Sequence, residues 1–290
     1  MMPPLLQAMR PAQWSKNLFV LAPLVFARGL MDPEMVVRAG VALAVFCCAA
    51  SAVYLINDIR DREADRQHPL KRQRPLAAGT LQVGTAALAA SVLAAVALGG
   101  ALWLGGKFTL LLVVYLGCNV GYTLGLKQVV ILDVMIVAVG FVVRVLCGGV
   151  AVGVALSRWL VLCTIFVALF LVLSKRRHEL VLLAADASRQ RLVLEHYSDR
   201  FLDQMINVVT ASTVVCYALY AVAPETEEKY NTDYLVYTVP LVLFGIFRYL
   251  YLTYRSDSLR NPTEAMLRDP PFLINLALWG LAVVWIVYGT

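Results

Sequence analysis

Charged residues are scarce in this chain. Lysine, arginine, aspartate and glutamate make up 15% of its 290 residues, hydrophobic residues make up 60%, and the mean hydropathy is +0.73. This composition excludes an ordinary globular domain and indicates an all-α, polytopic membrane protein, with 1–290 as one membrane domain. The net charge of +6 does not predict a nucleic-acid partner, because nearly half of the basic residues, 12 of 25, fall in two loops between apolar runs.

Disulfide and zinc patterns are lacking as well. The six cysteines all fall inside apolar runs, without a CxxC pair or a histidine close by in the sequence. We therefore expect small buried side chains at these positions, and neither disulfides nor zinc ligands. The first apolar run has no cleavage-like site and is followed by many more, so we expect no secretory signal peptide.

Long apolar runs are abundant. A transmembrane helix needs about 20 apolar residues, and this criterion predicts nine spans. By the positive-inside rule, the basic loops after the even-numbered spans and the amino terminus are cytoplasmic, and the carboxyl terminus lies outside. The long loops 57–80 and 175–203 are expected to form one polar cap. The predicted spans are 14–30, 35–56, 81–104, 108–126, 129–154, 157–174, 204–224, 234–254 and 272–289.

The first long loop opens with acidic residues. If the preceding helix continues, Asn57, Asp61 and Asp65 recur every four residues along one face, with Asp58 one turn from Asp61. Carboxylates at this spacing repel one another unless a divalent cation lies between them. Because Mg2+ takes oxygen ligands, usually one or two carboxylates plus substrate phosphates, the pattern predicts a magnesium–diphosphate site. Asn57, Asp58 and Asp61 are its candidate metal ligands, and Asp65 is a further candidate catalytic residue.

Basic residues follow these acids at once. Lys71 and Arg74 are candidates to donate to the phosphate oxygens that a metal leaves unbound. The alternative is a cytoplasmic loop that carries bases for topological reasons alone, which explains the bases but not the acids. Tyr54 lies one turn before Asp58 and is a candidate for the lining of the same pocket.

A second polar cluster, SKRRHELVLLAADASR at 174–189, follows the sixth span. Three adjacent bases point in three directions around a helix, so not all of them can meet one ligand. A stop-transfer signal explains any single base, but it gives no reason for the neighbouring histidine and glutamate. The cluster therefore predicts a phosphate site opposite the first one. Its candidate substrate-binding residues are Lys175, Arg177, His178 and Glu179, and Glu179 is also a candidate second metal ligand.

Further candidates for substrate contact lie at the cytoplasmic ends of two other spans. RPAQWSKN at 10–17 contains Lys16, and GYTLGLK at 121–127 contains Tyr122 and Lys127. The alternative for Lys16 is a side chain that reaches the membrane interface without binding a ligand.

Ionisable residues also occur within predicted spans. Asp133 and Arg144 lie in the fifth span and Arg248 in the eighth, where each costs about 2.5 to 3.5 kcal/mol on insertion scales and is expected to face a partner or a cavity. Asp133 and Arg144 are about 16 Å apart along a helix axis, so they do not pair with each other. Asp133 is expected to hold a lysine of the site.

NDIRDREAD at 57–65, followed by a basic stretch ending in RPL, resembles the first Asp-rich motif of the UbiA-type intramembrane prenyltransferase superfamily. The nine-span layout is similar over nearly the whole chain. The resemblance implies a UbiA-like fold, Mg2+ held by two Asp-rich motifs, and prenyl transfer from a prenyl diphosphate to an aromatic acceptor. The second motif departs from this pattern, because SKRRHEL offers one acid, Glu179.

RPAQWSKN, the NDxxDxxxD segment and SKRRHEL together resemble one branch of that superfamily. In this branch the donor is 5-phosphoribosyl 1-diphosphate and the acceptor is a polyprenyl phosphate, decaprenyl phosphate. The resemblance implies that the products are polyprenylphosphoryl-5-phosphoribose, a precursor of actinobacterial cell-wall arabinan, and diphosphate, and that the enzyme lies in the bacterial plasma membrane. A donor with an additional phosphate needs more cations and fewer acids, in agreement with the basic second motif. The acceptor phosphate is already an anion, so no general base is expected.

Two alternatives stay open at this point. The superfamily motif alone would also suit an aromatic prenyltransferase. Nine spans with intramembrane charges would suit a lipid or metabolite transporter, although the charges gather on one side and not at the midplane, where transporter sites usually lie. The length of the lipid tail and the formation of a homo-oligomer are not determined by the sequence.

Overall fold

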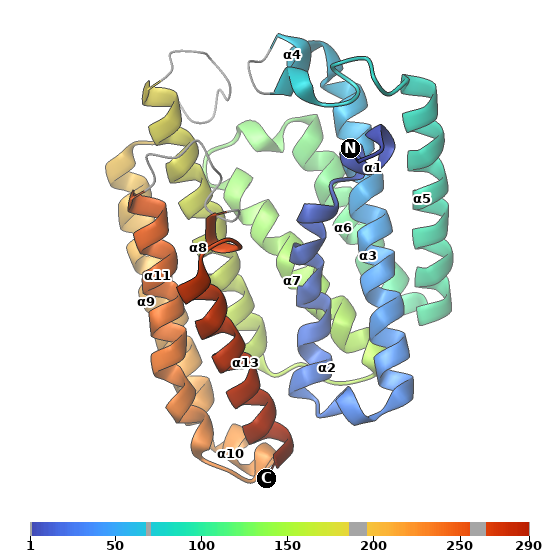
Figure 1. Cartoon of the computed structure of the whole chain (residues 1–290). Coiled ribbons are helices and arrows are strands. Elements are labelled where there is room, and N and C mark those ends of the chain that lie inside the picture. Colours follow the sequence, from blue (N-terminus) through green and yellow to red (C-terminus); the bar gives the residue numbers. More distant parts are fainter. Residues whose placement is uncertain (1, 68–70, 186–195, 256–264, 290) are drawn as a thin grey trace. The chain divides into compact units, whose positions relative to one another are not determined.

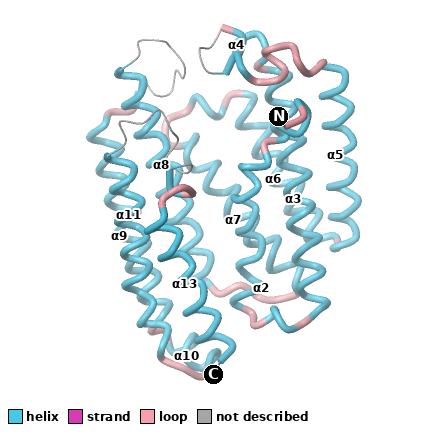
Figure 2. The backbone as a smooth tube through the Cα atoms, in the orientation of Figure 1, coloured by secondary structure: helices cyan, strands magenta, loops and turns pink. Residues whose placement is uncertain are grey.

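The protein was analysed as a computed structural model, which describes residues 2–67, 71–185, 196–255 and 265–289. Over these residues the chain forms helices and loops without any strand (Figure 2). It divides into two compact units. Unit 1 comprises Met1–Leu124 and Val143–Ala155, and unit 2 comprises Gly125–Val142 and Leu156–Thr290. The predicted all-α class is therefore confirmed.

Unit 1 contains one long helix, α3 (Pro33–Arg60), and a series of helices before and after it. Asp32 caps the start of α3, because its carboxylate accepts hydrogen bonds from the backbone N–H groups of Glu34 and Met35. The other helices of unit 1 are α1 (Pro4–Met9), η1 (Pro11–Leu21), α2 (Ala22–Phe26), η2 (Gly29–Met31), α4 (Arg62–Arg66), η3 (Lys71–Gln73), α5 (Val83–Leu104), α6 (Gly106–Leu124) and the second half of α7 (Leu132–Val152).

Helix α3 is the centre of unit 1, and α5 lies beside it (Figure 1). Glycine permits this close packing, since a Cβ added at Gly100 would lie 2.6 Å from Val45 Cγ2. Near the start of α3, Arg38 donates to the carbonyl oxygens of Leu104 (3.4 Å) and Ala151 (2.6 Å). It thereby satisfies carbonyl groups that the ends of α5 and α7 leave without helical partners.

The first predicted span, 14–30, does not form a transmembrane α-helix. Its residues form the 3-10 helix η1, the short helix α2 and η2. Polar side chains fix η1 against α3: Trp14 Nε1 donates to Ser51 Oγ at 3.1 Å, and Asn17 Nδ2 donates to Cys47 Sγ at 3.4 Å. Within the described residues, eight helices are long and apolar enough to cross a membrane, and they match the other eight predictions. The count of nine spans is therefore not confirmed.

The second half of α7 packs closely against η1. A Cβ added at Gly148 would lie 2.0 Å from the carbonyl oxygen of Val20. Only glycine fits at this position, because a backbone oxygen cannot rotate away as a side chain can. The contact holds the 3-10 segment inside unit 1.

Unit 2 is built on helix α8 (Arg158–Ala185), which packs against α9 (Asp199–Ala221). The two helices run antiparallel: Cys163 Sγ lies 3.4 Å from Cys216 Sγ near one end, and Arg177 pairs with Asp203 near the other. Helix α8 contains residues 174–185 of the predicted second cluster, and residues 186–189 of that cluster lie outside the described part of the chain. The remaining helices are the first half of α7, η4 (Leu126–Gln128), α10 (Pro224–Tyr230), η6 (Tyr234–Thr238), α11 (Val239–Arg255) and α13 (Pro270–Gly289).

Candidate functional site

The acidic segment of unit 1 continues the helical geometry of α3. Helix α3 ends at Arg60 and α4 begins at Arg62, yet the Asp61 N–H donates to the Asn57 carbonyl oxygen and the Asp65 N–H donates to that of Asp61, each at 2.8 Å. These are the i to i−4 bonds of an α-helix. The predicted spacing of Asn57, Asp61 and Asp65 is therefore present.

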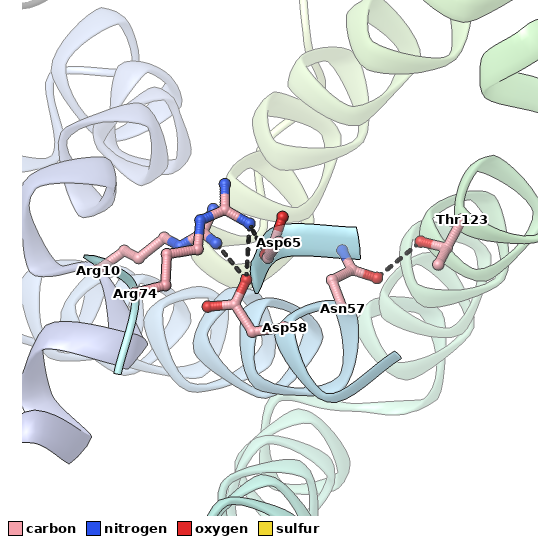
Figure 3. A network of polar contacts seen from close by, with 6 residues as sticks. All are labelled: Arg10, Asn57, Asp58, Asp65, Arg74 and Thr123. Atoms are coloured by element: carbon pink, nitrogen blue, oxygen red, sulfur yellow. Dashed lines mark hydrogen bonds and ion pairs between the residues drawn. The ribbon is translucent and has the colours of Figure 1, made fainter. Parts of the chain in front are cut away.

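Two of the four predicted polar residues, Asp58 and Asp65, form ion pairs with arginines. Asp58 is 2% exposed and accepts hydrogen bonds from Arg10 and from Arg74 Nη1, the latter at 3.2 Å. Arg74 Nη1 also donates to Asp65 Oδ2 at 2.6 Å. Figure 3 shows these four side chains converging, and we call them the arginine–aspartate cluster. Two guanidinium groups thus contact Asp58, which the sequence analysis named as a candidate metal ligand.

Arg10 was not among the predicted site residues. It lies between α1 and η1 with a left-handed backbone (φ 55°), which is uncommon for a residue other than glycine. Its guanidinium stacks over the ring of Tyr54, 4.9 Å from the ring centroid. The structure therefore brings Tyr54 to the cluster through a cation–π contact with Arg10.

Asn57 faces a different helix. Its side-chain oxygen lies 2.8 Å from Thr123 Oγ1 of α6, a residue that the sequence analysis did not single out (Figure 3). The signal for Thr123 was its place directly after Tyr122 in GYTLGLK. Asn57 and Asp61 are both partly buried.

The oxygen atoms of the acidic segment fit a metal that is shared with a substrate. Among the described residues, no group of three or more histidine, cysteine, aspartate or glutamate side chains could hold a metal ion without help. Mg2+ commonly keeps several waters and binds one or two protein oxygens together with substrate phosphates. Asn57 and Asp61 carry side-chain oxygens of the kind that such an ion binds, so the residues present fit a magnesium ion shared with a diphosphate.

Arg144, whose partner the sequence did not identify, lies in the interior of unit 1. Its Nε donates to Asn17 Oδ1 and its Nη2 donates to the Tyr115 hydroxyl, each at 2.9 Å. The guanidinium also lies over the rings of Phe46 (5.6 Å) and Tyr115 (4.7 Å). These contacts tie η1, which carries Lys16, to α6 and α7.

The second cluster, in unit 2, is less basic than its sequence suggests, because each of its three bases has an acidic neighbour. Lys175 Nζ lies 3.8 Å from Glu179 Oε1. Arg177 pairs with Asp203 and stacks on the ring of Tyr254, 3.9 Å from its centroid. Glu179 belongs to the cluster itself, but Asp203 lies 26 residues from Arg177 along the chain, so local sequence does not reveal that pair.

Arg176 carries the most buried ion pair of this cluster. It is 3% exposed, and it donates to Asp133 Oδ2 at 2.8 Å and to Glu179 Oε2 at 2.7 Å. The expectation that Asp133 holds a lysine is therefore wrong: its partner is an arginine, which is delocalised, weakly hydrated and better suited to a buried pair. Arg248 likewise finds a carboxylate partner, Asp269, through two hydrogen bonds of 3.0 and 2.8 Å.

Tyr197 completes the environment of Asp133. Its hydroxyl donates to Asp133 Oδ1 and accepts from the Ile131 N–H, each at 2.7 Å. Ile131 has φ 68°, a strained conformation for a β-branched residue. Burial, together with the hydrogen bond to Asp133, raises the pKa of Tyr197 to about 12. The strained turn before α7 is thus held by a tyrosine that precedes α9.

The other predicted residues lie on several elements. In unit 1, Lys16 lies on η1, Lys71 on η3 and Tyr122 on α6, and all three are partly buried. In unit 2, Lys127 lies on η4 and is partly buried, and His178 is a buried residue of α8. Arg74, the remaining basic candidate of the first loop, contacts Asp58 and Asp65 of the acidic segment.

Sequence and structure comparisons give four matches. The chain matches the sequence model of the UbiA prenyltransferase family over residues 18–276. It is 36% identical over 284 residues to a decaprenyl-phosphate phosphoribosyltransferase from Mycolicibacterium smegmatis, covering 95% of this chain and 89% of the relative. A protein of the same name from Mycobacterium tuberculosis is 35% identical over 277 residues, covering 94% and 90%. A UbiA homologue from Archaeoglobus fulgidus, bound to GPP and Mg2+, shares the fold at 19% identity, with a TM-score of 0.74 over 98% of this chain and 99% of that chain.

Proposed function

The chain belongs to the UbiA prenyltransferase family, and from this premise we propose that it is a polyprenyl-phosphate phosphoribosyltransferase. It transfers the 5-phosphoribosyl group of 5-phosphoribosyl 1-diphosphate to decaprenyl phosphate. The observation that carries the proposal is the likeness, over nearly the full length of both chains, to the two mycobacterial decaprenyl-phosphate phosphoribosyltransferases.

The reaction replaces one phosphate oxygen by another at the anomeric carbon of ribose. The bond from C1 to the diphosphate oxygen breaks, a bond from C1 to an oxygen of the acceptor phosphate forms, and diphosphate leaves with the bonding electrons. The acceptor phosphate is an anion before it reacts, so no side chain has to remove a proton from it. The protein's contribution is to bind both anions, to orient them and to stabilise the departing charge.

The acidic segment of unit 1 is the proposed site for the donor diphosphate. Asn57 and Asp61 would hold Mg2+ there, and the ion would supply positive charge to the leaving diphosphate. Asp58 and Asp65 hold Arg10 and Arg74 in place by ion pairs. Both arginines are partly exposed, at 28% and 29%, so N–H groups not used by the aspartates can donate to phosphate oxygens.

Lysines on separate elements are the proposed contacts for the other phosphates. Lys71, Lys16 and Lys127 carry compact positive charges suited to the 5-phosphate and the acceptor phosphate. In unit 2, Lys175, Arg177, His178 and Glu179 remain candidates, although the acidic neighbours of Lys175 and Arg177 reduce the positive charge available to a ligand. Tyr122 is a further candidate beside Thr123.

The proposed setting is the bacterial plasma membrane. The chain is an integral membrane protein of the UbiA family, and we propose that its polar loops and amino terminus face the cytoplasm, where a water-soluble phosphosugar is available. Residues 14–17 lie beside α3, and with 14–30 as a ninth crossing the carboxyl terminus would lie outside. The lipid acceptor would reach the site from the surrounding bilayer.

The test is a choice between donors. Purified protein in detergent is incubated with decaprenyl phosphate, Mg2+ and either 5-phosphoribosyl 1-diphosphate or a prenyl diphosphate, and the lipid extract is analysed by mass spectrometry. The proposal predicts decaprenylphosphoryl-5-phosphoribose from the first donor. Prenylation of an aromatic acceptor by the second donor, with no use of the first, would establish an aromatic prenyltransferase.

A further inference from the structure

The hydroxyl of Thr123 lies between two oxygen atoms in unit 1. Its Oγ1 is 2.8 Å from Asn57 Oδ1 and 2.8 Å from the carbonyl oxygen of Asn119, one helical turn earlier in α6 (Figure 3 shows the contact with Asn57). A hydroxyl carries one proton, so it can donate to only one of these two oxygens. In the remaining contact, Thr123 Oγ1 and the second oxygen would then lie 2.8 Å apart without a proton between them.

A half-turn of the Asn57 carboxamide removes this conflict. The rotation exchanges the positions of the oxygen and the nitrogen, which have nearly the same shape. Thr123 then donates to Asn119, as Thr109 of the same helix donates to Gly105 at 3.1 Å. The Asn57 nitrogen would then donate to Thr123 Oγ1, so the hydroxyl donates one hydrogen bond and accepts one. The Asn57 oxygen is turned away from Thr123.

We propose that Thr123 is a positioning residue that fixes the Asn57 carboxamide with its oxygen available to the metal of the donor diphosphate. The inference rests on the proposed magnesium site. A carboxamide binds Mg2+ through its oxygen and not through its nitrogen, so the orientation of the group decides whether Asn57 is a ligand. Groups that orient metal ligands in this way typically contribute about 10- to 100-fold to metal affinity or activity.

The test measures metal binding without turnover. Mn2+ replaces Mg2+ as a paramagnetic probe, 5-phosphoribosyl 1-diphosphate is present, and the lipid acceptor is left out. Electron paramagnetic resonance of free Mn2+ then gives the Kd. Thr123→Val should raise the Kd about 10-fold or more, whereas Thr123→Ser, which keeps the hydroxyl, should bind like the wild type. Thr109→Val is the matched control, because it removes a similar hydroxyl of α6 that bonds to Gly105.

A second background separates orientation from folding. Asn57→Asp presents an oxygen whichever way the group is turned, so Thr123→Val should have little further effect in that background. An equal loss in both backgrounds would show that the hydroxyl acts on the fold, and it would overturn the inference. So would an unchanged Kd in Thr123→Val alone. Failure of the proposed function is a separate result, since wild-type protein would then bind Mn2+ and donor but transfer no phosphoribosyl group to lipid.

Discussion

Asp58→Asn separates an ion-pair role from a metal-ligand role for this carboxylate. The substitution keeps the shape of the side chain and removes the charge that faces Arg10 and Arg74. Asp58 is 2% exposed, and the two arginines are 28% and 29% exposed. Breaking a buried pair typically costs 3 to 5 kcal/mol and an exposed pair about 0 to 1 kcal/mol. Because the arginines can regain water, we expect an intermediate loss of roughly 2 kcal/mol in the free energy of unfolding.

A loss of this size is measurable as a lower melting temperature in detergent. At about 2 to 4 °C per kcal/mol for a chain of 150 to 250 residues, Asp58→Asn should lower the Tm by roughly 4 to 8 °C. The matched control is Glu63→Gln, which breaks the pair with Arg66 in the same segment. Those side chains are 73% and 40% exposed, so its Tm should change by no more than about 1 °C.

The same variant also tests the assignment of the metal. If Asp58 holds arginines, the concentration of Mg2+ that gives half-maximal activity should stay within about 2-fold of the wild-type value, while Asp61→Asn should raise it about 10-fold or more. An unchanged Tm, together with a magnesium requirement raised as far as in Asp61→Asn, would refute the reasoning and return Asp58 to the set of metal ligands.

Two further predictions concern the packing of η1 and the environment of Asp133. Gly148→Ala would place a Cβ 2.0 Å from the Val20 carbonyl oxygen, so the Tm should fall by an amount that corresponds to about 1 to 3 kcal/mol; Gly117→Ala, with nothing within 4 Å of the added Cβ, is the control, and equal Tm values would contradict this packing. Tyr197 has a pKa near 12 in the folded protein and about 10 when unfolded, so its contribution to stability is complete below pH 10 and is lost as the pH rises through 12. An absorbance titration of tyrosinate should therefore differ between wild type and Tyr197→Phe near pH 12, and a difference near pH 10 would contradict the buried hydrogen bond to Asp133.

The helical framework could be predicted because a transmembrane helix is encoded locally. A run of about 20 apolar residues crosses a bilayer almost regardless of what surrounds it, and eight predicted spans have their counterparts in the structure. The first predicted span, 14–30, forms η1, α2 and η2 instead of one long α-helix, and its polar residues Trp14 and Asn17 bond to α3 at Ser51 and Cys47. Those partners lie 37 and 30 residues away in the chain, so composition alone could not indicate a 3-10 helix.

The site was predictable to the extent that it follows helical spacing. The periodicity of the acids placed Asn57, Asp61 and Asp65 correctly along one segment. It did not reveal that Arg10, 48 residues before Asp58, forms an ion pair with the Asp58 carboxylate. Nor did it reveal the pairing of Asp133 with Arg176, 43 residues apart. Long-range ion pairs depend on how helices pack against one another, which a single sequence does not state.

The most direct test of the account follows two atoms of the donor separately. Purified protein is incubated with decaprenyl phosphate and labelled 5-phosphoribosyl 1-diphosphate, in the presence of Mg2+ or of a chelator. The donor carries 14C in the ribose and 32P in the outer phosphate of its diphosphate group. The account predicts that 14C enters the lipid extract only with Mg2+, while an equal amount of 32P stays in water as diphosphate. Appearance of 32P in the lipid, or of neither label with an active preparation, would contradict phosphoribosyl transfer.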